Sequence, residues 1–489
     1  MSAGLKERTV DGILWNFLNN FAEKAIAFVV GIVLARLLSP EEYGVVAMVT
    51  IFIVLTQPFV NSGFSQALIR KERCTPADFS TVFYFNLLVG IVIYVILFFC
   101  APALSRFFKE PQLIQIARVI GIIIIIEAIS LIQITIITKE INFKLLTKIM
   151  VSASVLSGTL GIVLALKGAG VWALVYRSLS QQLIISILLW SFNQWKPTRL
   201  FSVTSLRELF GFGSKLLLTG LLDKLYFNIY NLVIAKRFSA QELGLYSRAD
   251  MFKNLASQNM SEIISRVAFP ALSTIQGDPE KLKRSYKRLL LSAVFIVTVL
   301  LFGMAAVSES LIITLIGEQW RGAVPYLQLL CFAGIFYPAF MLIQSLLYVL
   351  GKSGLILRLE IFSKLLSIPV VTVGILWGIK LMIMAMILAA MLEYLVKAYY
   401  SGRFIGYTLF RQLLDLLPSL VMALLTGGIM FLIGMLLTTS PLITLLVQGG
   451  SGAIFILGVS ELVKPKEYTF LKELILERAG KFMASRKNR

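Results

Sequence analysis

The chain has 489 residues, of which 58% are hydrophobic and only 15% are charged, and its mean hydropathy is +0.84. Soluble domains have about 45–50% apolar and about 25% charged residues, and they need a polar surface that this composition cannot supply. The composition therefore excludes a string of soluble domains and predicts a polytopic membrane protein.

The net charge of +20 comes from 46 Lys and Arg against 26 Asp and Glu, and the sequence contains no histidine. The lack of histidine excludes histidine-based triads, metal sites and proton relays. The three cysteines are far apart and show no Cys-x-x-Cys spacing, so we expect no metal and no cofactor. No soluble domain gathers the basic residues, so the bilayer or an anionic membrane substrate is the expected partner, and nucleic acid is not.

Apolar runs separated by short polar connections predict fourteen membrane-spanning helices in an all-α fold. The expected spans are residues 12–38, 43–65, 81–101, 113–137, 147–166, 169–193, 209–235, 242–269, 288–307, 324–350, 355–378, 380–402, 418–437 and 442–463. The first and the eighth of these spans are long enough to cross a bilayer but are unusually polar.

The basic residues also predict the topology. If the N-terminus is cytoplasmic, about 28 of the 46 Lys and Arg lie on the cytoplasmic side and about 7 lie outside, as the positive-inside rule requires. Both termini are therefore expected in the cytoplasm, which agrees with an even number of spans. The basic tail 464–489 is expected to lie as an amphipathic helix on the inner leaflet.

An internal repeat is visible at an offset of 200 residues. The segment LARLLSPEEYG (34–44) aligns with IAKRFSAQELG (234–244), and Glu23-Lys24 aligns in the same register with Asp223-Lys224. Six helices per repeat is an even number, so the halves are expected to be parallel repeats with a binding site between them. The expected domains are an N-lobe (1–208), a C-lobe (209–405), two added helices (406–463) and the tail (464–489).

Polar residues concentrate on the predicted helices of the repeated hairpins. Asn16, Asn19, Asn20 and Glu23 share one helix face, and the predicted span 242–269 carries a second polar stripe. Because ionisable groups within a membrane are costly, we expect these helices to line a water-filled cavity whose cations bind phosphate or pyrophosphate. The substrate-binding candidates are Lys24, Lys215, Lys224, Arg248, Lys253, Asn16, Asn20, Asn254, Arg118 and Arg177.

A structural alternative stays open for each cation, because lysine and arginine also snorkel to the interface or form ion pairs with nearby carboxylates. The candidates for binding a coupling Na⁺ or proton are Glu23, Glu127, Asp223 and Asp250. Glu127 lies within the apolar run GIIIIIEAIS, where ion coupling and a hydrogen bond to a neighbouring helix are equally possible. Glu360 and Glu393 each precede a lysine by four residues, a spacing that predicts structural ion pairs with Lys364 and Lys397.

Several segments resemble a known family. These are GILWNF in the first span, LARLLSPEEYG (34–44), NSGFSQALIRK (61–71), ALSRFFKEP (103–111), the long stretch 210–249 and LIGEQWRGAVPYLQLL (315–330). In order and spacing they are similar to the polysaccharide transporter family, the Wzx-like lipid-linked oligosaccharide flippases of the MOP flippase superfamily. The resemblance implies a MATE-like fold with two six-helix lobes and two additional C-terminal helices.

The resemblance further implies a flippase of the inner (cytoplasmic) membrane that is not an enzyme. Its expected substrate is an undecaprenyl-pyrophosphate-linked repeat unit for lipopolysaccharide, capsule or exopolysaccharide, and Lys215, Lys224, Arg248 and Lys253 are expected to meet the pyrophosphate or acidic sugars. Polysaccharide polymerase machinery is an expected partner. No GxxxxGK[ST] motif occurs, so alternating access is expected to use an ion gradient and not ATP. The alternatives are an ion-coupled multidrug antiporter of the same superfamily and a membrane polysaccharide polymerase.

Overall fold

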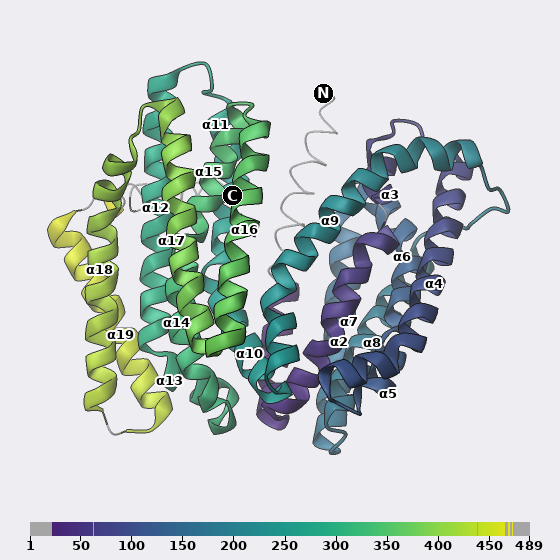
Figure 1. Ribbon diagram of the computed structural model, residues 1–489, viewed down its shortest axis with the longest axis horizontal. Coiled ribbons are helices and arrows are strands. Elements are labelled where there is room, and N and C mark those ends of the chain that lie inside the picture. Colours follow the sequence, from purple (N-terminus) through teal and green to yellow (C-terminus); the bar gives the residue numbers. More distant parts are fainter. Residues whose placement is uncertain (1–21, 62, 438, 465–467, 470–471, 473–489) are drawn as a thin grey trace, which may run out of the picture. The chain divides into compact units, whose positions relative to one another are not determined.

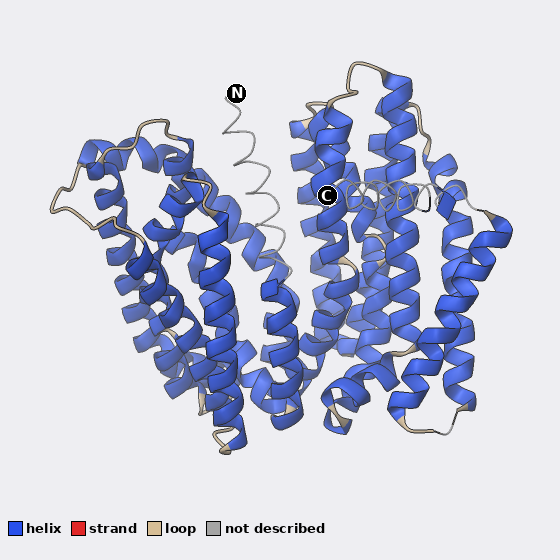
Figure 2. Cartoon of the chain, turned by 180° about the vertical axis from the view of Figure 1, so that it is seen from behind, coloured by secondary structure: helices blue, strands red, loops and turns tan. Residues whose placement is uncertain are grey.

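The structure is a computed structural model that describes residues 22–61, 63–437, 439–464, 468–469 and 472. Within these residues every regular element is a helix and there is no strand (Figure 2). A helix pairs its backbone N–H and C=O groups within its own segment, which is what a chain surrounded by lipid requires. The chain divides into two compact units, Met1–Gly244 and Leu245–Arg489.

Unit 1 begins, among the described residues, with a helical segment at 22–37. Its further helices are α2 (Pro40–Asn61), α3 (Phe64–Arg70), α4 (Pro76–Phe108), α5 (Leu113–Ile120), α6 (Ile122–Lys139), α7 (Phe143–Leu166), α8 (Val171–Phe192) and α9 (Val203–Arg237) (Figure 1). In this bundle α4 packs on α6, α7 packs on α8, and α9 packs on α2, α3 and α4.

The boundary between the units falls inside α10 (Ala240–Ala256). The remaining helices are α11 (Gln258–Ser273), α12 (Pro279–Ala306), α13 (Ser308–Ile316), the 3₁₀ helix η1 (Glu318–Ala323), α14 (Val324–Gly334), α15 (Tyr337–Val349), α16 (Ser353–Trp377), α17 (Ile379–Ile405), α18 (Leu409–Leu436) and α19 (Pro441–Val463). The sequence placed the lobe boundary at residue 208, whereas α9 makes its helix contacts within unit 1.

Eleven helical segments of the described residues are long and apolar enough to cross a membrane. They correspond to eleven of the fourteen predicted spans, and the all-helical, MATE-like fold class is confirmed. Residues 12–21 of the first predicted span lie outside the described residues, and the rest of it is helical as far as residue 37. The segments α9 and α10–α11 are helical but too polar to qualify. The structure thus does not confirm the count of fourteen.

Several predicted spans are interrupted. The predicted span 43–65 is divided into α2 and α3, the span 113–137 is divided at Gly121, and the span 242–269 is divided at Ser257. At the start of α3, Gly63 has a φ of 66°, and a Cβ there would lie 2.6 Å from the carbonyl oxygen of Gly213. A left-handed backbone this close to α9 requires glycine.

The two repeat segments have the same local structure. Each ends a helix, at residue 37 and at residue 237, and each starts the next helix three residues later, at Pro40 and Ala240. The Oγ of Ser39 accepts the backbone N–H of Glu42 at 3.3 Å, and the Oγ of Ser239 accepts that of Glu242 at 3.2 Å. Both turns are therefore fixed by the same side-chain N-cap.

The two repeat turns also pack against one another reciprocally within unit 1. A Cβ on Gly44 would lie 1.7 Å from the carbonyl oxygen of Ala240, and a Cβ on Gly244 would lie 1.9 Å from that of Pro40. Each glycine thus faces the start of the other repeat's helix. The glycine pair shared by both repeats is required for this close approach.

In unit 2, Lys397 joins α16 to α17 inside the bundle. Its ammonium lies 2.7 Å from Glu393 Oε1, four residues earlier, which confirms that predicted pair. The same ammonium lies 3.2 Å from Glu360 Oε1 on α16, a partner that the i, i+4 spacing did not predict for it. Ser363 Oγ donates to Glu393 at 2.7 Å, so this ionic group ties the two helices together.

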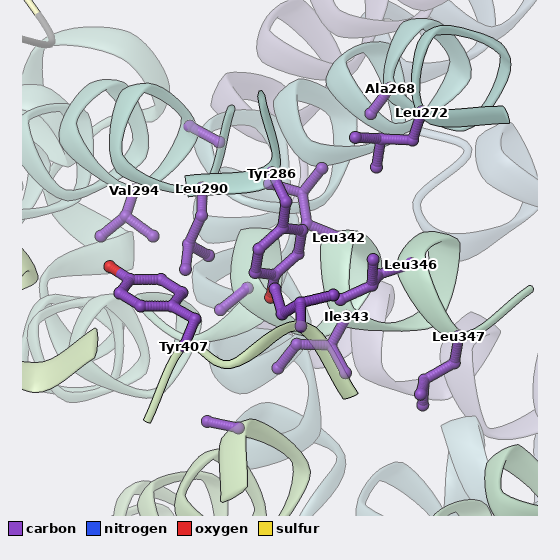
Figure 3. Close-up of a cluster of buried hydrophobic side chains, with 14 of the residues drawn as sticks. Ala268, Leu272, Tyr286, Leu290, Val294, Leu342, Ile343, Leu346, Leu347 and Tyr407 are labelled. Atoms are coloured by element: carbon purple, nitrogen blue, oxygen red, sulfur yellow. The ribbon is translucent and has the colours of Figure 1, made fainter. Parts of the chain in front are cut away.

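A large apolar cluster holds unit 2 together (Figure 3). Tyr286 and Leu290 of α12 pack there with Leu342 and Leu346 of α15. Tyr407 belongs to the same cluster and lies beside α12. Tyr286, Leu290 and Leu346 are fully buried. This core fixes α12 and α15, against which the polar helix α11 packs.

We expect Gly44→Ala and Gly244→Ala each to destabilise the protein by about 1–3 kcal/mol, because either Cβ would collide with backbone that cannot move aside freely. The check is the midpoint of thermal unfolding of the purified protein in detergent. Gly449→Ala is the matched control, since nothing lies within 4 Å of its added Cβ. Unchanged midpoints for both repeat glycines would contradict the reciprocal packing.

Candidate functional site

The candidate site residues that the structure describes lie on the segment 22–37, α5, α6 and α8–α10. Those up to residue 244 belong to unit 1, and Arg248, Asp250, Lys253 and Asn254 belong to unit 2. Asn16 and Asn20 lie outside the described residues, and so does the side chain of Lys215. The two sets are therefore considered one unit at a time.

In unit 1 the structure brings Glu127 and Lys224 near each other. Glu127 on α6 accepts a hydrogen bond of 3.4 Å from the side-chain amide of Gln57 on α2. The Lys224 ammonium on α9 is close enough to act electrostatically on the same carboxylate. Three helices thus contribute to one polar cluster, and of the two interpretations left open for Glu127, the hydrogen bond to a neighbouring helix is observed.

The other α9 residues flank this cluster. Asn228 donates from Nδ2 to the backbone carbonyl of Lys224 at 2.9 Å, one turn along the helix, and Asp223 is half-buried beside it. In the repeat-related position, Glu23 is half-buried next to the exposed Lys24, whose charge acts on it. Both acidic–basic doublets are thus adjacent charge pairs on helices of unit 1.

Arg118 and Arg177 are engaged with neighbouring helices. The guanidinium of Arg118 on α5 lies 4.2 Å from the centre of the Phe98 ring on α4, and its Nε donates to the Phe98 carbonyl at 3.5 Å. The aliphatic part of Arg177 on α8 packs against Gly161 of α7, where a Cβ would lie 3.0 Å from the arginine Cβ. Contacts of this kind are the structural alternative to ligand binding.

In unit 2, Asp250, Lys253 and Asn254 form a single cluster on α10. Asp250 Oδ1 lies 2.7 Å from Lys253 Nζ, and Asp250 Oδ2 accepts a hydrogen bond of 2.8 Å from Asn254 Nδ2. The side chains of Lys253 and Asp250 are 15% and 30% exposed. Lys253 therefore already has a carboxylate partner, and a ligand anion would have to compete with it.

Arg248 is the most buried of the candidate cations, at 8% exposure. Its guanidinium lies 5.7 Å from the centre of the Trp320 ring, and Nη1 lies 3.2 Å from the sulfur of Met251. Trp320, on η1, is fully buried. Contact with an aromatic face is a common environment for a guanidinium group, which keeps its charge when it is buried in this way.

Two residues of these clusters were not predicted, Gln57 and Trp320. Gln57 is a polar residue in an otherwise apolar run next to Pro58, a signal that could have been read. Trp320 gives no sequence signal of its own, because only the packing of η1 on α10 brings it to Arg248. The described residues contain no group of three His, Cys, Asp or Glu side chains that could hold a metal ion.

Several known proteins are similar to this chain in sequence. TuaB of Bacillus subtilis (strain 168), a teichuronic acid biosynthesis protein, is 25% identical over 82% of this chain and 85% of its own length. The lipopolysaccharide biosynthesis protein WzxC of Escherichia coli (strain K12) is 25% identical over 76% of each chain. ExoT of Rhizobium meliloti (strain 1021), a succinoglycan biosynthesis transport protein, is 25% identical over 66% of each.

Two solved structures have the same fold. The lipid II flippase MurJ in an inward closed conformation matches 95% of this chain and 100% of its own, with a TM-score of 0.75 and 14% identity. An inward-facing multidrug resistance MATE family transporter of the MOP superfamily matches 78% of this chain and 94% of its own, with a TM-score of 0.62 and 17% identity. The chain thus has the fold of membrane transporters.

The family model described as "Polysaccharide biosynthesis protein" matches residues 33–325, which is more than half of the chain. The chain thus combines the fold of known membrane transporters with sequence similarity to proteins named for polysaccharide biosynthesis and transport. It belongs to this family of polysaccharide biosynthesis proteins.

Proposed function

We propose that the protein is a flippase for lipid-linked oligosaccharides, which moves undecaprenyl-pyrophosphate-linked repeat units across the inner membrane by alternating access. The names of its relatives, which serve teichuronic acid, lipopolysaccharide and succinoglycan biosynthesis, support a surface polysaccharide as the final product. The flippase fold supports the same type of transport.

One observation carries the proposal: Lys224 and Arg248 are cationic side chains on helices that pack against membrane-spanning helices. Placing a charge at the centre of a membrane helix costs about 2.5–3.5 kcal/mol on insertion scales. Lys224 lies near one carboxylate, and buried Arg248 lies against an aromatic ring. A pyrophosphate is a strong acceptor for the donors of a lysine or an arginine, and its charge offsets that of either side chain.

Glu127 is our candidate for the coupling-ion site. It lies within an apolar stretch of α6, its side chain is bonded by a neutral amide, and its carboxylate faces the charge of Lys224. Binding of Na⁺ or a proton to this carboxylate would weaken its hold on Lys224. The ion gradient could thus change how strongly the lysine attracts the pyrophosphate.

Two observations weigh against the alternative functions. An extruder of organic cations would need carboxylates without cationic partners, whereas Asp250 and Glu127 both have a lysine nearby. A polysaccharide polymerase would need a sizeable extramembrane domain, and the described connections between helices are short. The same vesicles that report transport should therefore form no polymerised sugar.

Lys224→Met and Arg248→Met should each reduce translocation of the lipid-linked oligosaccharide by about tenfold or more, because a charge-assisted hydrogen bond to phosphate is lost while the aliphatic volume is kept. The measurement is oligosaccharide crossing in proteoliposomes. Lys224→Arg should restore most of the rate. Lys167→Met, in the exposed turn between α7 and α8, is the control. Wild-type transport in both methionine variants would refute the phosphate-site assignment.

Glu127→Gln should leave the protein folded but make transport insensitive to imposed Na⁺ and proton gradients, because a neutral amide cannot exchange an ion. Transport is compared with and without each gradient in the same vesicles. Glu280→Gln, an exposed carboxylate in the first turn of α12, should keep the full response. If Glu127→Gln still responds like wild type, another carboxylate must couple the ion.

We further propose that the protein lies in the inner membrane with both termini in the cytoplasm, as the distribution of Lys and Arg indicates. A green fluorescent protein fused to either terminus should therefore fluoresce, and an alkaline phosphatase fused there should be inactive. A phosphatase fused within the turn at Gly378, just before Lys380 and on the opposite side, should be active. The reverse pattern would overturn the topology.

A further inference from the structure

Unit 2 contains two adjoining pockets, neither of which is lined by the candidate site residues on α9–α11. The polar pocket, of about 480 Å³, lies among α12, α13, η1, α14, α18 and α19. The apolar groove, of about 790 Å³, runs between α18 and the helices α12 and α14, with Lys380 of α17 at its rim. Both volumes are in the range of ligand sites.

The two pockets share three lining residues, Ala306, Gln328 and Phe431. They therefore form one continuous site with a polar and an apolar part. The polar part carries Glu309, Arg321, Gln448 and Thr444, and the apolar part carries leucine and phenylalanine side chains. A site divided in this way fits an amphipathic ligand, with its headgroup at one end and its chains at the other.

The two cations of the site differ in whether a carboxylate already pairs with them. Arg321 Nη1 lies 2.7 Å from Glu309 Oε1 and also pairs with Glu318, so this arginine is already neutralised. The Lys380 side chain makes no hydrogen bond or ion pair with any residue that the structure describes. One cation is therefore left over at the rim of an apolar groove, where it would attract an anion.

The neighbourhood of Lys380 is typical of the depth of lipid headgroups. It follows the turn at Trp377-Gly378, where the tryptophan side chain is 62% exposed. Exposed tryptophans of membrane proteins gather at the interface between lipid and water. On α18, Leu424 and Leu432 line the groove and are 55% and 59% exposed, so its apolar part opens to the acyl chains.

From this arrangement we propose that the groove binds an anionic glycerophospholipid with a polyol headgroup. Its phosphate is held by Lys380, its headgroup hydroxyls bond to Gln328 and the polar pocket, and its chains lie along α18. The polar pocket has room for a glycerol headgroup, and its lining offers side-chain hydrogen-bonding groups to the headgroup hydroxyls. A zwitterionic headgroup would bring an ammonium close to Lys380, which disfavours it.

The glycines of α18 allow a direct test. Gly427 lets α18 approach the backbone of Phe302 on α12, where an added Cβ would lie 3.0 Å from the carbonyl oxygen. Its neighbour Gly428 also lines the groove but has nothing within 4 Å of an added Cβ. Gly428→Leu therefore adds apolar volume to the lining of the groove at a position where the added Cβ meets no neighbouring atom.

The experiment uses the purified full-length protein, stripped of lipid in detergent and incubated with phosphatidylglycerol, phosphatidylethanolamine or undecaprenyl phosphate. Native mass spectrometry counts the bound lipids. Lys380→Gln and Gly428→Leu should each lower retention of one phosphatidylglycerol by about tenfold, the loss expected for one charge-assisted contact or one blocked groove. Lys167→Gln and Gly450→Leu, which remove an exposed lysine and an open glycine elsewhere, should retain it.

Equal retention of phosphatidylglycerol in all four variants would overturn the site. Equal retention of phosphatidylethanolamine, with the same sensitivity to Lys380→Gln, would overturn its preference for an anionic lipid. Displacement of phosphatidylglycerol by undecaprenyl phosphate at equal concentration would assign the groove to an isoprenoid lipid and refute the phospholipid. None of these outcomes depends on transport, so they are independent of the proposed flippase activity.

Discussion

A polar group on a membrane helix has no water to bond with, and this constraint governs much of the structure. Glu127 is bonded by Gln57 from another helix, Asp250 is paired with Lys253, and Lys397 holds two carboxylates at once. A helix that shifted would lose such a contact and leave a charged group unpaired in lipid. The free energy of an unpaired charge is larger than that of a small change in apolar packing, so these contacts fix the positions of the groups that make them. The polar helices α9–α11 can belong to the bundle only under this condition.

The buried cations of unit 2 differ in the kind of side chain that surrounds them. Lys397 has two carboxylates and a serine bonded to one of them, and it is almost fully buried. Arg248 is buried to a similar extent, but it lies against Trp320 and Met251, neither of which bears a charge. The first arrangement holds two helices together through ion pairs, whereas the second places a buried cation against uncharged side chains.

Much of the fold followed from the sequence. Hydropathy located eleven spans that the structure also has, and the offset of 200 residues located two turns with the same cap and a reciprocal contact. The interruptions at Gly63, Gly121 and Ser257 were not predicted, since a glycine or serine in an apolar run leaves the hydropathy high while the helix ends. The sequence predicted which helices carry the candidate site residues. It did not predict that these residues form separate clusters, such as those around Glu127 and Asp250.

The sequence by itself determined the class of protein, the repeat and the contacts between residues one helical turn apart, such as Glu393 with Lys397 and Asp250 with Asn254. The helical period alone decides which residues share a face, so such pairs need no knowledge of neighbouring helices. Only the tertiary structure gave Glu127 its partner Gln57, Arg248 its tryptophan, and Lys397 its second carboxylate on α16. Those partners come from other helices, and which helix lies beside which is decided by the packing of the whole bundle.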